Sequence, residues 1–104
     1  MDNILSLLGL MYKANKLLFG DSVLENITKV KYLFIASDAS SKTKERYLKK
    51  CYYYNIEYND IFKTVELSKA LGKKNIKIVG LTDEGFKKAL KNKIKEEANG
   101  KTDI

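Results

Sequence analysis

Two nearly continuous apolar segments constrain the fold most strongly. Residues Tyr32–Ala36 and Ile76–Leu81 show no regular alternation of polar and apolar side chains. Such segments are typical of strands buried on both faces, in sheets that helices cover on both sides. Ile56–Tyr58 is predicted as a short strand, although the signal for a strand around Ile56 or Ile61 is weak. We therefore predict an α/β fold, a three-layer α-β-α sandwich with a central sheet of about four mixed strands.

Helical periods occupy the segments between these strands. The expected helices cover residues 3–16, a second segment that starts near residue 21, a third that ends near 54, residues 64–71, and a last segment after residue 83. The expected capping residues are Asp21 and Ser22 for the second helix, Ser37, Asp38, Ser40 and Ser41 for the third, Gly72 at the end of the fourth, and Thr82 and Asp83 for the last. The segment Leu17–Gly20 is interpreted as a connection.

The composition indicates a globular protein of a reducing compartment. The chain has 104 residues, the size of one domain, with 44% hydrophobic and 32% charged residues. Cys51 is the only cysteine, so no disulfide within the chain can form. The start of the chain lacks the basic region of a signal peptide, and its apolar stretch Leu7–Tyr12 is too short to span a membrane. We therefore expect a cytoplasmic protein without a membrane partner.

The charge balance is the first indication of function. Lysine and arginine total 20 against 13 acidic residues, a net charge of +7, and Arg46 is the only arginine. A basic domain of this kind is a candidate for binding polyanions, chiefly nucleic acid. The alternative is a lysine-rich surface that only maintains solubility. Because lysine binds phosphates as a point charge, affinity should depend on salt.

Catalytic residue types are largely missing. The sequence has no histidine, the commonest general base and metal ligand. Gly80 and Gly85 have the spacing of a phosphate-binding loop, but Phe86 and Lys87 follow where that motif needs Lys and Ser or Thr. Cys51 lies on the apolar stripe of its helix, which favours a buried structural thiol. We predict neither an enzyme nor a cofactor or metal site.

Lysines gather in three groups, and tyrosines are frequent. The lysine groups are Lys13, Lys16, Lys29 and Lys31; Lys69, Lys73 and Lys74; and Lys87, Lys88, Lys91 and Lys95. The last group is interpreted as a solvated helix face, whereas the first two surround loops and helix ends. Tyr52 and Tyr53, beside two lysines, could stack on bases if exposed. We adopt the ordinary interpretation, which is that they are half-buried.

Several segments in order resemble one known family. They are Leu8–Lys16, Gly20, Lys31–Ser40, Lys50–Asn55, Leu67–Gly72 and Asp83–Phe86. Together they are similar to the kink-turn RNA-binding ribosomal proteins of the L-seven-Ae and L-thirty-e type, and within these to the bacterial YlxQ-like branch. The resemblance covers about residues 5 to 90 and implies an α-β-α sandwich that binds RNA. We assign one RNA-binding domain to residues 1–98 and expect a tail over 99–104, whose residues are mostly polar.

The resemblance also implies where RNA binds. One place is the glycine turn with the start of the second helix, and the other is the loop Leu71–Asn75. The family motif Gly-x-Asn-Glu-x-x-Lys falls on Gly20, Ser22, Val23 and Asn26, so only the glycine is kept. Val23 cannot accept a hydrogen bond from a guanine edge. The expected RNA-binding residues are Lys13, Lys16, Gly20, Asp21, Ser22, Asn26, Lys29, Gly72, Lys73 and Lys74.

These observations leave two functional hypotheses open. The leading one is binding of structured RNA, ribosomal or otherwise tied to translation, with ribosomal or translation-factor proteins as further partners. The alternative is a protein-interaction module of the same fold, which the altered motif around Ser22 and Val23 would favour.

Overall fold

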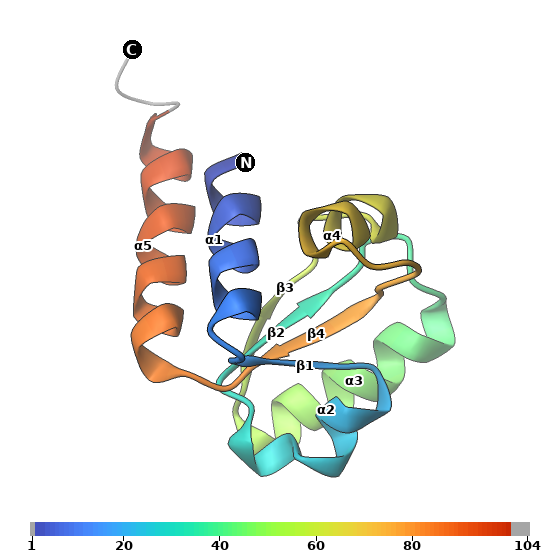
Figure 1. Ribbon diagram of the computed structural model, residues 1–104. Helices are drawn as coiled ribbons and strands as arrows, with labels where there is room; N and C mark the ends of the chain where they lie inside the picture. Colours follow the sequence, from blue (N-terminus) through green and yellow to red (C-terminus); the bar gives the residue numbers. More distant parts are fainter. Residues whose placement is uncertain (1, 101–104) are drawn as a thin grey trace.

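The computed structural model describes residues 2–100 and shows a single mixed sheet (Figure 1). Its strands are β1 (Leu17–Phe19), β2 (Tyr32–Ile35), β3 (Glu57–Asn59) and β4 (Ile78–Leu81), in the order β1-β4-β2-β3. Strand β4 pairs antiparallel with both β1 and β2, and β2 pairs parallel with the edge strand β3. The predicted mixed four-stranded sheet is confirmed.

Helices cover both faces of this sheet (Figure 1). On one face, α1 (Asp2–Lys13) packs against α4 (Thr64–Leu71) and α5 (Glu84–Gly100). On the other lie α2 (Asp21–Glu25), the 3-10 helix η1 (Ile27–Lys29) and α3 (Ser41–Tyr54). Both β2 and β4 are buried along their whole length, as their apolar sequences predicted. The three-layer α-β-α sandwich is therefore confirmed.

Close packing at Gly80 determines how near α2 and η1 lie to the sheet. A Cβ atom added at Gly80 would lie 3.1 Å from Cγ2 of Val23 and 3.3 Å from Cγ2 of Val30. Val23 is fully buried in this contact, in the core that the sheet shares with the helices. The small residue in the middle of β4 thus sets the height of α2 above the sheet, and with it the position of the turn that precedes α2.

Three boundaries around the first two helices differ from the prediction. Helix α1 ends at Lys13 rather than residue 16, because Asn15 takes the left-handed conformation, with φ of 60°. The predicted connection Leu17–Gly20 contains the strand β1, which is too short to reveal its period in the sequence. The second helix divides into the five-residue α2 and η1, with Asn26 between them.

The helix caps also differ in part. Gly20, rather than Asp21 or Ser22, is the N-cap of α2, and no side chain caps this helix. Ser40 caps α3 as expected, since its Oγ accepts a hydrogen bond from Thr43 N at 3.2 Å. Asp38, expected at α3, instead accepts hydrogen bonds from N and Oγ1 of Thr64, at 2.9 and 2.8 Å, and so caps α4.

The last two helices otherwise follow the sequence. Helix α4 spans residues 64–71 as predicted and ends at Gly72, whose φ is 65°. Asp83 caps α5 by accepting a hydrogen bond from Phe86 N at 2.8 Å. The backbone of α5 continues to Gly100, so the first two residues of the expected tail are helical, and residues 101–104 lie outside the described part of the chain.

Candidate nucleic-acid interface

The Gly20 turn and the last residue of the predicted loop, Asn75, line one groove, whereas Gly72, Lys73 and Lys74 do not line it. Its volume is about 370 Å³, and it lies at the end of the sheet where β1 finishes and β4 begins. We call it the Gly20 groove, and three parts of the chain line it. They are the β1–α2 turn with Phe19, Gly20 and Asp21, helix α3 with Thr43, Arg46 and Tyr47, and the segment entering β4 with Asn75, Ile76, Lys77 and Ile78. Residues more than 50 positions apart thus share one surface.

The Gly20 turn has a backbone conformation that favours glycine. Its φ is 52° and its ψ is −127°, and a Cβ added there would point into open space. Gly20 is exposed, while its N–H donates to Ile78 O at 3.4 Å and its carbonyl accepts a hydrogen bond from Tyr47 Oη at 3.2 Å. The turn is therefore held from β4 on one side and from α3 on the other, and stays accessible.

The opposite wall of the groove is the loop between α4 and β4. Gly72 and Asn75 both take positive φ, 65° and 56°, which turns the chain back toward the sheet. The buried Ser68 fixes the end of this loop, because its Oγ donates to Thr64 O at 2.6 Å and accepts from Ile76 N at 2.8 Å. Lys73 and Lys74 are exposed on this loop.

An aromatic pair beside the groove holds one lysine of this loop. The rings of Tyr12 and Phe19 meet edge-on, with centroids 5.7 Å apart. The Nζ of Lys73 lies 5.3 Å from the Tyr12 centroid and 5.2 Å from that of Phe19. Both distances are within the range of cation–π attraction. This cluster was not predicted from the sequence, since its members come from α1, β1 and the α4–β4 loop.

The electrostatics of the groove combine cations with one carboxylate. Arg46 lies with its guanidinium carbon 6.0 Å from the ring centroid of Tyr47. Burial raises the pKa of Tyr47, the positive charge of Arg46 opposes this rise, and the negative charge of Asp21 adds to it. Lys77 is half-buried, with its Nζ 3.4 Å from Thr64 Oγ1. Arg46 and Lys77 were not among the predicted site residues.

Several expected residues lie elsewhere or are occupied. Lys16 is at the other end of β1 from Gly20, where its Nζ lies 3.9 Å from the Asp83 carboxylate. Lys29 belongs to η1, two residues before Lys31, whose N–H donates to Leu81 O. Because Leu81 pairs with Leu17, this segment also adjoins the end of β1 that is distant from Gly20. Lys13 is exposed at the end of α1. The structure therefore does not gather the first lysine group around Gly20.

The motif positions after Gly20 are mainly structural. Val23 is fully buried against Gly80. The amide Nδ2 of Asn26 donates to Ser22 O at 3.0 Å, a carbonyl of α2 that also accepts a hydrogen bond from Asn26 N at 3.1 Å. Ser22 is half-buried. These positions hold α2 in place, and its exposed start is the part that adjoins the groove.

Two interpretations of lysines and tyrosines are corrected. Lys87 and Lys91 of α5 lie 3.2 and 2.9 Å from the Glu57 carboxylate of β3, so part of the expected solvated face ties α5 to the edge strand. The hydrogen bond from Lys91, followed by that from Lys87, lowers the pKa of Glu57. Tyr52 and Tyr53 are 84% and 79% exposed, so the half-buried interpretation is wrong.

Cys51 is a structural residue. It is buried in the core side of α3, and burial raises its pKa to about 11. The thiolate, which is the reactive form, is therefore scarce at neutral pH. The sequence-based prediction of a buried thiol is confirmed.

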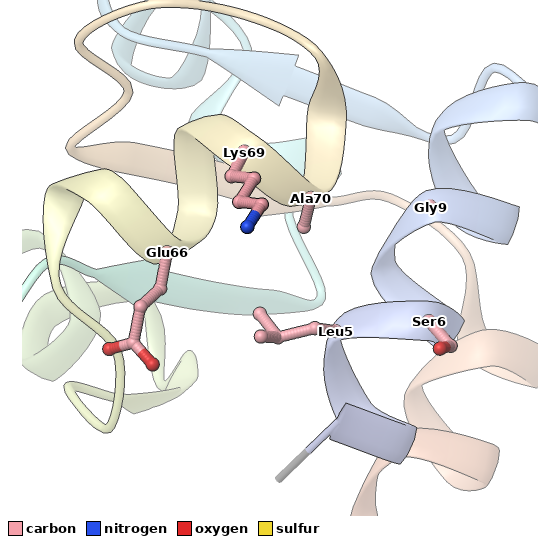
Figure 2. A pocket seen from close by; sticks show the side chains of 6 residues that line it. All are labelled: Leu5, Ser6, Gly9, Glu66, Lys69 and Ala70. Carbon is pink, nitrogen blue, oxygen red and sulfur yellow. The ribbon is translucent and has the colours of Figure 1, made fainter.

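A second hollow lies between α1 and α4 (Figure 2). Leu5 faces Lys69 and Ala70 across it, and a Cβ at Gly9 would lie 3.7 Å from Ala70 O. Residues 2–100 contain no cluster of three or more potential metal ligands, and no helix among them is long and apolar enough to cross a membrane.

Comparison with known proteins places this fold in a family. The RNA-binding protein YlxQ of Enterococcus faecium is 34% identical over 93 residues, which cover 86% of this chain and 89% of that protein. The RNA-binding protein YlxQ of Bacillus subtilis is 35% identical over 83 residues, covering 77% and 83% of the two chains. The chain belongs to the YlxQ family. No protein-family model matches it.

Solved structures share the fold of this YlxQ-family chain. A protein of unknown function from Bacillus halodurans is 34% identical, with a TM-score of 0.81 over 86% of this chain and 93% of that one. The Giardia lamblia 15.5kD RNA binding protein shares the fold at 17% identity, with a TM-score of 0.70 over 85% and 78% of the chains. The predicted resemblance to the YlxQ-like branch is confirmed by the two YlxQ relatives.

Proposed function

We propose that this YlxQ-family chain binds structured RNA at the Gly20 groove. The observation that carries the proposal is the meeting of Gly20, Arg46 and the α4–β4 loop at one accessible end of the sheet. The relatives of the family are called RNA-binding proteins, which supports the same function here. The net charge of +7 favours a polyanionic partner.

Contacts to the RNA backbone would supply most of the affinity. Arg46 offers a planar fork of donors suited to phosphate oxygens, and Lys73 a charge held over the two rings beside Gly20. Asp21, Gly72 and Lys74 remain in the proposed interface, with Lys13 at its margin. Lys16 and Lys29 are left out because they lie at the other end of β1.

The proposed mode of recognition is shape rather than base sequence. Val23 is buried and Asn26 is hydrogen-bonded within the protein, so neither is poised to contact the edges of sheared G·A pairs. A bent backbone such as a kink-turn could still fit the groove through phosphate contacts. From the likeness to ribosomal proteins we propose a ribosomal or translation-associated RNA in the cytoplasm as the target.

Filter binding of a kink-turn hairpin across a salt series tests the proposal. Arg46→Gln and Lys73→Gln should each weaken binding and reduce the slope of log affinity against log salt by about 0.7 to 0.9, the value of one phosphate contact. Lys88→Gln, on α5 across the sheet, removes the same charge from an exposed site and should leave affinity and slope nearly unchanged.

Two results would refute specific recognition at this groove. One is equal affinity for the hairpin and for heparin, an unrelated acidic polymer. The other is an equal loss from Lys88→Gln and Lys73→Gln, which would indicate only general charge attraction. Crosslinking in cells, followed by sequencing of the attached RNA, then identifies the target.

A further inference from the structure

The outward side of α3 carries an aromatic ring that the fold does not use. Tyr52 is 84% exposed, although tyrosine normally buries much of its ring. The same helix has the cationic residues Lys42, Lys44, Arg46, Lys49 and Lys50 and a single acidic residue. Exposed rings among cations are the pattern of surfaces that bind single-stranded nucleic acid.

This ring is connected to the Gly20 groove by a continuous surface. A shallow hollow over α3 shares Thr43 and Arg46 with the groove. That hollow shares Glu45 and Lys49 with a further one, and Tyr52 lines the latter. Each hollow thus borders the next, from the Gly20 turn across α3 to the exposed ring.

The charges along this surface suit a phosphate chain. Beyond the groove, which contains Asp21, the hollows over α3 include one carboxylate, Glu45, and it pairs with Lys49 at 3.4 Å. Lys42 and Arg46 flank this pair on the exposed side of the helix. From Thr43 to Tyr52 the helix rises about 14 Å, at about 1.5 Å per residue. Eight nucleotides, at about 3.4 Å each even when stacked, exceed that span.

We propose that α3 binds an unpaired strand that leaves the RNA in the Gly20 groove, with Arg46 and Lys49 contacting its phosphates and Tyr52 stacking on a base. This inference rests on the proposed function and adds a second, single-stranded element to the ligand. It assigns a role to a ring that contributes little to the core.

Fluorescence anisotropy with three probes tests the inference. The probes are a blunt kink-turn hairpin, the same hairpin with eight adenosines added at its 3′ or 5′ end, and free octaadenosine. For the unmodified protein, one of the two extensions should raise affinity about ten-fold over the blunt hairpin, the effect of one stacked base. Tyr52→Phe keeps the ring and should retain this gain. Tyr52→Ala should reduce the gain to less than two-fold, with affinity for the blunt hairpin unchanged.

The outcomes separate this inference from the proposed function. If the blunt hairpin binds and neither extension adds affinity, or if Tyr52→Ala keeps the full gain, the α3 inference is overturned while the groove stands. If the hairpin does not bind at all, the proposed function fails. The binding of free octaadenosine then tests the α3 inference by itself. If octaadenosine binds and Tyr52→Ala weakens this binding, the result supports α3 as a single-strand site. If octaadenosine does not bind, or binds equally well to Tyr52→Ala, the α3 inference is overturned and this face is left to a protein partner.

Discussion

Replacing Gly80 with alanine tests the packing that positions the Gly20 turn. Gly80 has no positive φ, so alanine fits its backbone without strain. Its methyl group, however, would lie 3.1 Å from Val23 Cγ2 and 3.3 Å from Val30 Cγ2. Either α2 and η1 must move outward by a few tenths of an ångström or the two valines must change rotamer.

The expected cost follows from two opposing effects. Overpacking a core by one methyl group costs about 1 to 3 kcal/mol. Replacing a glycine within a strand by alanine raises the free energy of unfolding by about 0.5 to 1 kcal/mol, because the unfolded chain has less conformational entropy. From the middle of each range, we expect Gly80→Ala to lower the free energy of unfolding by about 1 kcal/mol, which for a domain of this size lowers Tm by about 4 to 8 °C.

Urea and thermal unfolding of four proteins would measure this effect. They are the unmodified chain, Gly80→Ala, Val23→Ala and the double variant. Val23→Ala alone should be destabilising because it leaves a cavity, but it also makes room for the new methyl group. The double variant should therefore lose at least about 0.5 kcal/mol less than the sum of the single variants. Additive losses within about 0.3 kcal/mol would refute the argued contact.

Gly85→Ala is the matched control. It lies in the first turn of α5, and an added Cβ would meet only the end of the Asp83 side chain, at 3.2 Å. That carboxylate can move, and alanine favours helix over glycine by about 1 kcal/mol. We expect this variant to be as stable as the unmodified chain or more stable. An equal loss at both glycines would show that the Gly80 effect is not specific to its packing.

Three further predictions follow from individual contacts. Tyr47→Phe removes the hydrogen bond to Gly20 O and should cost about 0.5 to 1.5 kcal/mol in urea unfolding; an unchanged midpoint would contradict that role. Because Lys91 and Lys87 lower the pKa of Glu57 in the folded chain, its contribution to stability is present above the ordinary glutamate pKa and is lost as pH falls through the lowered value. Glu57→Gln should therefore make Tm fall less steeply as the pH is lowered below neutrality. An unaltered fall of Tm would show that the ion pairs of Glu57 do not contribute to the loss of stability in acid. Cys51, with a pKa of about 11, should not react with a thiol reagent at pH 8 until urea unfolds the chain, and rapid reaction of the folded protein would contradict its burial.

Local patterns in the sequence were sufficient to predict most of the layers of the fold. The apolar segments around Leu33 and Val79 predicted buried strands, because a strand covered on both sides has no polar face to display. Helix α4 was predicted with both its ends, since Thr64 begins an apolar period and Gly72 takes the left-handed conformation that ends it. The family resemblance likewise depended on the order of segments along the chain.

The tertiary structure alone decided how the site is assembled. The strand order β1-β4-β2-β3 brings Gly20 beside Ile78 and sends Lys16 to the other end of β1, and no local pattern encodes that neighbourhood. Strand β1 exists because β4 offers it hydrogen-bonding partners, whereas three residues are too few to show a period. The placement of Arg46 in the groove and the exposure of Tyr52 depend on how α3 sits against the sheet, which long-range packing fixes and sequence periodicity does not.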